Sequence, residues 1–216
     1  MNRIFDQSNP VMRAMGKLFD IGWLSILWLL CSIPVFTIGA STTALYYTTV
    51  KVLRRERGYV STEFFHSFRQ SFISATILWL GFLLLYGLLA FNIRVTASDT
   101  LIGIYLALGI LVTGVLCYVF PVLSRFELKL TKILKLCFYM SCRHVLFTLG
   151  FLILLIGSGV LLFFTLSFPI ILLVLPAGVT WIYSFLMEHL MKKYMPKEEK
   201  KVLDDGEEVT SWYNEL

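Results

Sequence analysis

Long stretches of this sequence contain almost no basic residues, and they alternate with short clusters that hold nearly all of them. Residues 73–123 contain one such residue, Arg94, and residues 144–191 contain none. Apolar runs bounded by basic clusters are typical of a chain that crosses a membrane several times, because Lys and Arg accumulate in cytoplasmic loops. The pattern therefore predicts an all-α fold, a polytopic transmembrane helical bundle.

The charge content points the same way. Only 15% of the 216 residues are charged and 57% are hydrophobic, whereas a soluble domain carries about 25% charged residues. The net charge of +5 comes from residues that flank apolar runs and do not line one folded face. We therefore expect the lipid bilayer as the partner of this charge, and no nucleic acid.

Five stretches are long enough to cross a bilayer, since a helix needs about 20 apolar residues to pass the hydrocarbon layer. They are residues 18–37, 73–92, 101–123, 145–166 and 169–190, the last with Pro176 inside it. A sixth stretch, residues 38–53, is short and semi-polar. It is rich in Gly, Ala, Ser and Thr, which predicts close packing against a neighbouring helix.

The basic clusters favour six spans. If residues 38–53 cross, 18 of the 19 Lys and Arg lie on the side of both termini; if not, the split is 15 against 4. We therefore predict six spans in three helical hairpins, with five spans as the alternative. The transmembrane domain would cover residues 1–191, and residues 192–216 would form a polar cytoplasmic tail.

Two inner segments are predicted to be amphipathic helices lying in the membrane interface. Phe64, Phe68 and Phe72 share one face of residues 61–72. Residues 125–143 repeat the design, with a basic stripe opposite an apolar one. We expect both helices to anchor in lipid. Docking of a cytoplasmic partner is the alternative.

Catalytic signatures are not found in the sequence. It has no P-loop, no His-Glu-x-x-His and no Gly-x-Ser-x-Gly, and the middles of the predicted spans carry no ionisable residue that would mark an ion pathway. None of the four cysteines forms a Cys-x-x-Cys, so small buried hydrophobes are expected. We predict a non-enzyme without cofactor or metal. The spans also contain aromatic residues that could line a path for an uncharged solute, so a transport function is an alternative.

Several sequence blocks together resemble the YesL family of bacterial membrane proteins. They are Ser8-Asn9-Pro10 with Gly16–Asp20, the long run from Leu27 to Tyr59, and Phe120-Pro121 with Ser124–Glu127. The family has no defined activity and no catalytic residues to carry over. Its members tend to be encoded beside ABC-type sugar importers and polysaccharide-degrading enzymes. The resemblance therefore implies a bacterial plasma-membrane accessory of carbohydrate use.

The candidate residues follow from these features. Arg125 and Glu127 form a predicted inner-face pair, and Pro34, Gly39 and Tyr46 would shape the first hairpin. The leading hypothesis is an accessory protein that assists carbohydrate uptake by contacting subunits of an ABC sugar importer. A stand-alone transporter or channel for an uncharged solute is the second hypothesis, and a membrane enzyme is the third.

Overall fold

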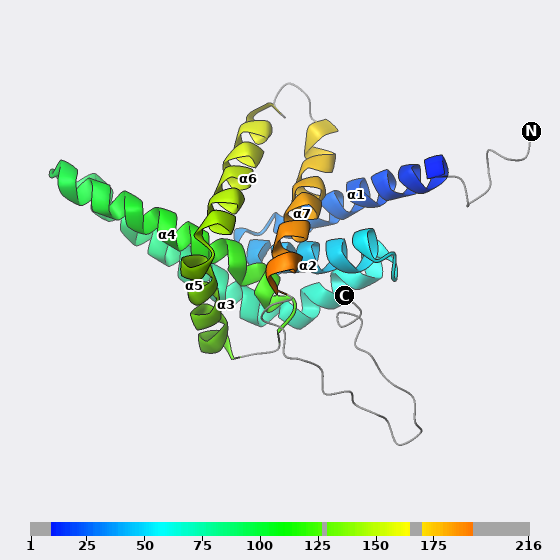
Figure 1. Ribbon diagram of the computed structural model, residues 1–216, viewed down its shortest axis with the longest axis horizontal. Coiled ribbons are helices and arrows are strands. Elements are labelled where there is room, and N and C mark those ends of the chain that lie inside the picture. The colour runs from blue at the N-terminus through cyan, green and yellow to red at the C-terminus, as the bar shows by residue number, and fades with distance from the viewer. Residues whose placement is uncertain (1–9, 127–128, 165–169, 192–216) are drawn as a thin grey trace, which may run out of the picture. The chain divides into compact units, whose positions relative to one another are not determined.

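The computed structural model describes residues 10–126, 129–164 and 170–191 (Figure 1). The elements in chain order are α1 (Pro10–Ser32), η1 (Val35–Thr37), α2 (Ile38–Thr48), η2 (Thr49–Arg54), α3 (Val60–Val95), α4 (Asp99–Leu123), α5 (Leu130–Arg143), α6 (Val145–Phe164) and α7 (Ile170–Met191). The η1 segment is a 3-10 helix and η2 is a π-helix. No strand occurs within these three ranges, which confirms the all-α fold class.

The chain divides into two compact units, Met1–Ser184 and Phe185–Leu216. Within the described residues, the second unit consists of the end of α7, from Phe185 to Met191. The packing described below lies within the first unit. The polar tail predicted over residues 192–216 lies outside the described residues.

Five described helices are long and apolar enough to cross a membrane. They are α1 over Met15–Ser32, α3, α4, α6 over Val145–Phe163 and α7 over Leu172–Met191. They overlap the five long apolar stretches of the sequence, although α1 ends at Ser32 and α3 begins at Val60. The prediction of a multi-pass helical protein is therefore supported. Helix α2 has 11 residues and is not among them, so the sixth crossing remains a prediction.

Helices α1 and α2 form an antiparallel hairpin around a short turn. In the turn, the Thr37 hydroxyl donates to the carbonyl oxygens of Cys31 and Pro34, at 2.6 Å each. At the other end of the hairpin, the Lys17 ammonium near the start of α1 lies 2.7 Å from the Glu56 carboxylate, just past η2. The turn is short and reverses the chain directly.

Helix α2 is the most enclosed element of the first unit. It packs most extensively against α3 and also contacts α1 and α4. The Ser41 hydroxyl donates to the Thr37 carbonyl and the Thr43 hydroxyl to the Gly39 carbonyl, at 3.0 and 2.9 Å. Because these two hydroxyls bond within their own helix, Ser41 and Thr43 can be buried without losing their hydrogen bonds. The small-residue pattern thus serves close helix packing, as predicted.

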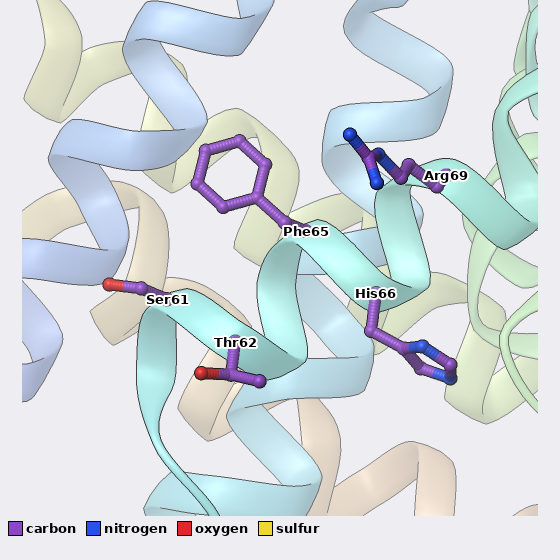
Figure 2. A pocket seen from close by; sticks show the side chains of 5 residues that line it. All are labelled: Ser61, Thr62, Phe65, His66 and Arg69. Atoms are coloured by element: carbon purple, nitrogen blue, oxygen red, sulfur yellow. The ribbon is translucent and has the colours of Figure 1, made fainter.

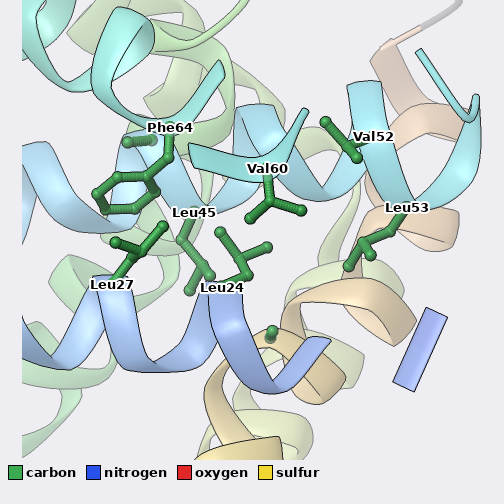
Figure 3. Packing of buried hydrophobic residues seen from close by; sticks show 9 residues of the cluster. Leu24, Leu27, Leu45, Val52, Leu53, Val60 and Phe64 are labelled. Atoms are coloured by element: carbon green, nitrogen blue, oxygen red, sulfur yellow. The ribbon is translucent and has the colours of Figure 1, made fainter. Parts of the chain in front are cut away.

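The core of this unit is an apolar cluster shared by α1, α2, η2, α3 and α7 (Figure 3). Its buried members are Leu24, Leu27, Ala44, Leu45, Val52, Leu53, Val60, Phe64 and Ala177. Helix α7 is also tied to α1 by a hydrogen bond from the Ala177 backbone amide to the Ser25 hydroxyl, at 3.2 Å. Residues that are distant in sequence therefore hold the first hairpin in place.

Helix α3 corrects one prediction. Residues 61–72 are not a separate interfacial helix but the first part of a single helix of 36 residues. Phe64 is fully buried in the core cluster and does not face lipid. Phe68 stacks on it with ring centroids 6.2 Å apart. The buried part of this aromatic face therefore packs against protein, in the cluster that α3 shares with α1, α2 and η2.

Helix α5 corrects the second interfacial prediction. Its apolar side is buried at Ile133, Cys137 and Met140, and α5 packs mainly against α4. The Thr148 hydroxyl, on α6, donates to the Ser141 carbonyl at 3.1 Å and so ties the end of α5 to α6. The amphipathic pattern is present as predicted, but the surface that covers its apolar side is protein.

Candidate functional site

Two of the predicted hairpin residues shape the first turn. Pro34 lies at the start of η1 with extended backbone angles, and its carbonyl oxygen accepts the Thr37 amide at 2.9 Å. Gly39 lies against α3 so closely that a Cβ atom would stand 2.7 Å from both the Ala75 carbonyl oxygen and the Trp79 Cβ. Gly39 is therefore a packing residue, since only a glycine fits that contact without displacing α3.

Tyr46, the third of these residues, belongs to an aromatic cluster. It is 2% exposed, and its ring meets the Tyr183 ring edge-on, with centroids 6.1 Å apart. Tyr183 packs on Phe151 at 4.4 Å, and Phe151 on Tyr118 at 5.3 Å. The Tyr118 and Thr148 hydroxyls share a hydrogen bond of 3.0 Å. The cluster connects α2, α7, α6 and α4, so Tyr46 helps to hold four helices together.

The predicted inner-face pair is only partly described. Arg125 follows the end of α4 and is buried, with 9% of its surface exposed. Its backbone amide donates to the Val122 carbonyl at 3.1 Å. Glu127 lies outside the described residues. The burial of Arg125 means that a soluble partner could reach little of its side chain.

An ion pair that sequence reasoning missed joins η2 to the start of α3. The Lys51 ammonium lies 2.7 Å from the Glu63 carboxylate, and both side chains are mostly shielded from solvent. Lys51 also donates to the Tyr47 hydroxyl at 3.3 Å and lies 5.4 Å from the centre of that ring. Because the two residues are 12 positions apart on two helices, no local sequence pattern predicts their pairing. The ion pair fixes the turn between η2 and α3.

The ion pair gives a testable coupling. In a double-mutant cycle of Lys51→Met and Glu63→Gln, we expect a coupling energy of about 1.5 kcal/mol, as for hydrogen bonds to charged groups. The measurement is the free energy of unfolding in mixed detergent micelles, followed by tryptophan fluorescence. Lys17 with Glu56, a solvent-exposed pair at the same distance, is the matched control and should couple by less than about 1 kcal/mol. Equal coupling in the two pairs would contradict this assignment.

The outward side of α5 combines basic and aromatic side chains. Lys132 and Lys135 are exposed, and Phe138 and Tyr139 are 52% and 47% exposed. The Arg143 guanidinium donates to the Tyr139 hydroxyl and lies 5.6 Å from the centre of its ring. We call this set, Lys132, Lys135, Phe138, Tyr139 and Arg143, the α5 face. Exposed aromatic rings beside arginine are typical of protein interfaces.

The thiols offer little chemistry in the described residues. Burial raises the pKa of the Cys137 thiol to about 12, so it stays protonated at neutral pH and packs as a small apolar group. The prediction of a buried hydrophobe is correct for Cys137, whereas Cys142 is exposed. Among the described residues, no three His, Cys, Asp or Glu side chains gather as a metal site would require.

An open hollow of about 420 Å³ lies on the first part of α3. Its lining residues, all on α3, are Ser61, Thr62, Phe65, His66 and Arg69 (Figure 2). The indole nitrogen of Trp23, on α1, donates to the Ser61 hydroxyl at 2.8 Å. The hollow therefore offers two hydroxyls, an imidazole and a guanidinium beside an exposed aromatic ring. The spacing of His66 and Arg69, three positions apart on one helical face, is the signal in the sequence that could have indicated this hollow.

These features define the class of protein. Five long apolar helices within the described ranges make a multi-pass helical membrane protein. Residues 21–93 match a family model described as "Protein of unknown function, DUF624". The chain is also 25% identical over 141 residues to the "Uncharacterized protein YesL" of Bacillus subtilis (strain 168). Both matches support the resemblance of this chain to the YesL family, whose function is unknown.

The extent of these matches is limited. The alignment with YesL covers 60% of this chain and 65% of the length of YesL. The family match includes the first hairpin with Pro34, Gly39 and Tyr46, as well as the hollow on α3. The α5 face lies outside the family match. No solved structure matches the chain.

Proposed function

We propose that the protein is a non-enzymatic accessory of carbohydrate uptake in the bacterial plasma membrane and that it acts by binding an ABC-type sugar importer. The observation that carries the proposal is the burial of the apolar side of α5 against α4. The helix then has no need of lipid to cover that side. The α5 face is left exposed for a partner.

The proposed topology places this face in the cytoplasm. The basic clusters favour cytoplasmic termini and inner loops. Helix α2 with η2 then supplies the sixth crossing inside the protein, where it is covered by α1, α3 and α4. The short turns after α1 and α3 leave little protein on the outer side for a partner to contact. An importer subunit would therefore meet the basic inner surface.

The test is co-purification of the tagged full-length protein from native membranes in mild detergent, with bound proteins identified by mass spectrometry. We expect importer subunits to be recovered. The double substitution Lys132→Glu with Lys135→Glu should reduce that recovery at least about fivefold, because it reverses two charges on the α5 face. Arg94→Glu, an exposed charge reversal at the far end of α3, is the control and should leave recovery unchanged.

Two results would contradict the proposal. One is recovery of no importer subunit with the unaltered protein. The other is solute uptake by the purified protein alone in liposomes, which would favour the stand-alone transporter instead.

A further inference from the structure

We propose that the hollow on α3 binds the phosphate of an anionic phospholipid headgroup. The hollow is formed by Ser61, Thr62, Phe65, His66 and Arg69. With 3.6 residues per turn, these positions fall within an arc of about 140° on one side of the helix, with Arg69 near its middle. All five side chains line the hollow, and they fan out from this part of the helix (Figure 2).

The chemistry of the lining suits a phosphate monoanion. A guanidinium donates two parallel hydrogen bonds to phosphate oxygens, and neighbouring hydroxyls can add single bonds. The Ser61 oxygen already accepts the Trp23 indole at 2.8 Å, so its own proton is available to donate outward. Arg69 and His66 are exposed. Among the described residues that line the hollow, none is a carboxylate that would repel an anion.

The surroundings favour a lipid over a dissolved phosphate. Beyond Arg69, α3 carries no charged residue until Arg94. The two are 25 positions apart, about 37 Å along the helix axis. This is longer than the hydrocarbon layer of about 30 Å and shorter than the full bilayer of about 40–45 Å. Both guanidiniums can therefore lie at headgroup depth, on opposite sides.

Apolar groups border the hollow on the side that an acyl chain would occupy. Ile73, one turn after Arg69, is 72% exposed, and Ile77 one turn later is also exposed. Phe65, within the hollow, and Trp23, next to Ser61, are exposed aromatic groups. Such rings sit favourably at the boundary between headgroups and acyl chains. A phospholipid can place its phosphate in the polar hollow and its acyl chains on the apolar border, whereas free phosphate can occupy only the hollow.

The experiment compares phospholipid retention by the full-length protein using native mass spectrometry from detergent. Phosphatidylglycerol is the anionic probe and phosphatidylcholine the zwitterionic one. We expect retention of phosphatidylglycerol to fall at least about fivefold in Arg69→Gln, because the headgroup phosphate would lose the charged hydrogen bonds of the guanidinium. Arg94→Gln, which removes an equal charge from the same helix, should not change it.

The remaining arms separate the alternatives. Thr62→Ala, which leaves every charge in place, should also weaken the retention of phosphatidylglycerol. It replaces Arg69→Gln as the test variant if Arg69→Gln does not fold. Equal loss in Arg69→Gln and Arg94→Gln would reduce the effect to general surface charge and overturn the proposal. Displacement of phosphatidylglycerol by millimolar inorganic phosphate would overturn it too, because the site would then bind a dissolved anion.

Discussion

Replacing Phe64 by alanine is expected to destabilise the protein by about 3–5 kcal/mol, the usual cost of removing a buried aromatic side chain. Phe64 is fully buried in the core cluster that α1, α2 and α3 share, and it stacks on Phe68. Truncation would leave a cavity where three helices meet. The measurement is the free energy of unfolding in mixed micelles, together with the fraction of protein that remains monodisperse.

The matched control is Phe91→Ala on the same helix. Phe91 is exposed, so we expect its ring to face lipid and not other helices. Its removal should change the free energy of unfolding by less than about 1 kcal/mol, since exposed positions contribute little. If the two substitutions had similar effects, Phe64 would be facing lipid, as the sequence pattern alone predicted.

Replacing Gly39 by alanine is expected to destabilise the packing of α2 on α3 by about 1–3 kcal/mol, the usual range for overpacking a tight interior. The added methyl group would meet the Ala75 carbonyl oxygen and the Trp79 Cβ at 2.7 Å. The first is a backbone atom and the second is fixed to it, so neither can turn away. The helices must separate, and thermal unfolding in detergent reports the loss.

Gly87→Ala is the control for this substitution. Gly87 is on α3, and no neighbouring atom lies within 4 Å of the place that an alanine methyl group would take. Alanine should therefore be neutral there or stabilise the helix by up to about 1 kcal/mol. Gly39→Ala is thus expected to lower the free energy of unfolding, whereas Gly87→Ala is expected to leave it unchanged or raise it. A neutral Gly39→Ala would mean that α2 and α3 are farther apart than described.

The long apolar helices could be predicted from hydropathy because their sequences contain one dominant signal. Residues 101–123 and 145–166 are uniformly apolar, and α4 and α6 follow them closely. The burial of α2 could be expected only in part. Its small residues predict close packing, but hydropathy does not tell a short membrane span from a helix enclosed by others.

The apolar faces of residues 61–72 and of α5 could be predicted from the sequence, but the surfaces that cover them could not. The pattern of Phe64, Phe68 and Phe72 identifies an apolar face correctly, but periodicity does not say whether lipid or protein covers it. Contacts made by α1, α2 and η2 decide that question for α3, and contacts made by α4 decide it for α5. The Lys51 and Glu63 pair was missed for the same reason, because it depends on two helices meeting.

Some candidate residues could be recognised from the sequence, and others depend on contacts between helices. Gly39 was recognised from composition, and its role follows from local geometry. The hollow on α3 was not predicted as a site, since residues 61–72 were interpreted as an interfacial helix that anchors in lipid. Its surroundings also depend on Trp23, which reaches Ser61 from 38 positions away.

The enclosure of α2 has a consequence for how the protein is made. Helix α2 leaves the ribosome before α3, which supplies most of its packing surface. Its hydroxyl-rich sequence is a weak signal for entry into lipid on its own, since insertion depends on the apolar content of each segment. We therefore expect α2 to reach its packed position only after α3 has been synthesised, so that the two helices are placed together.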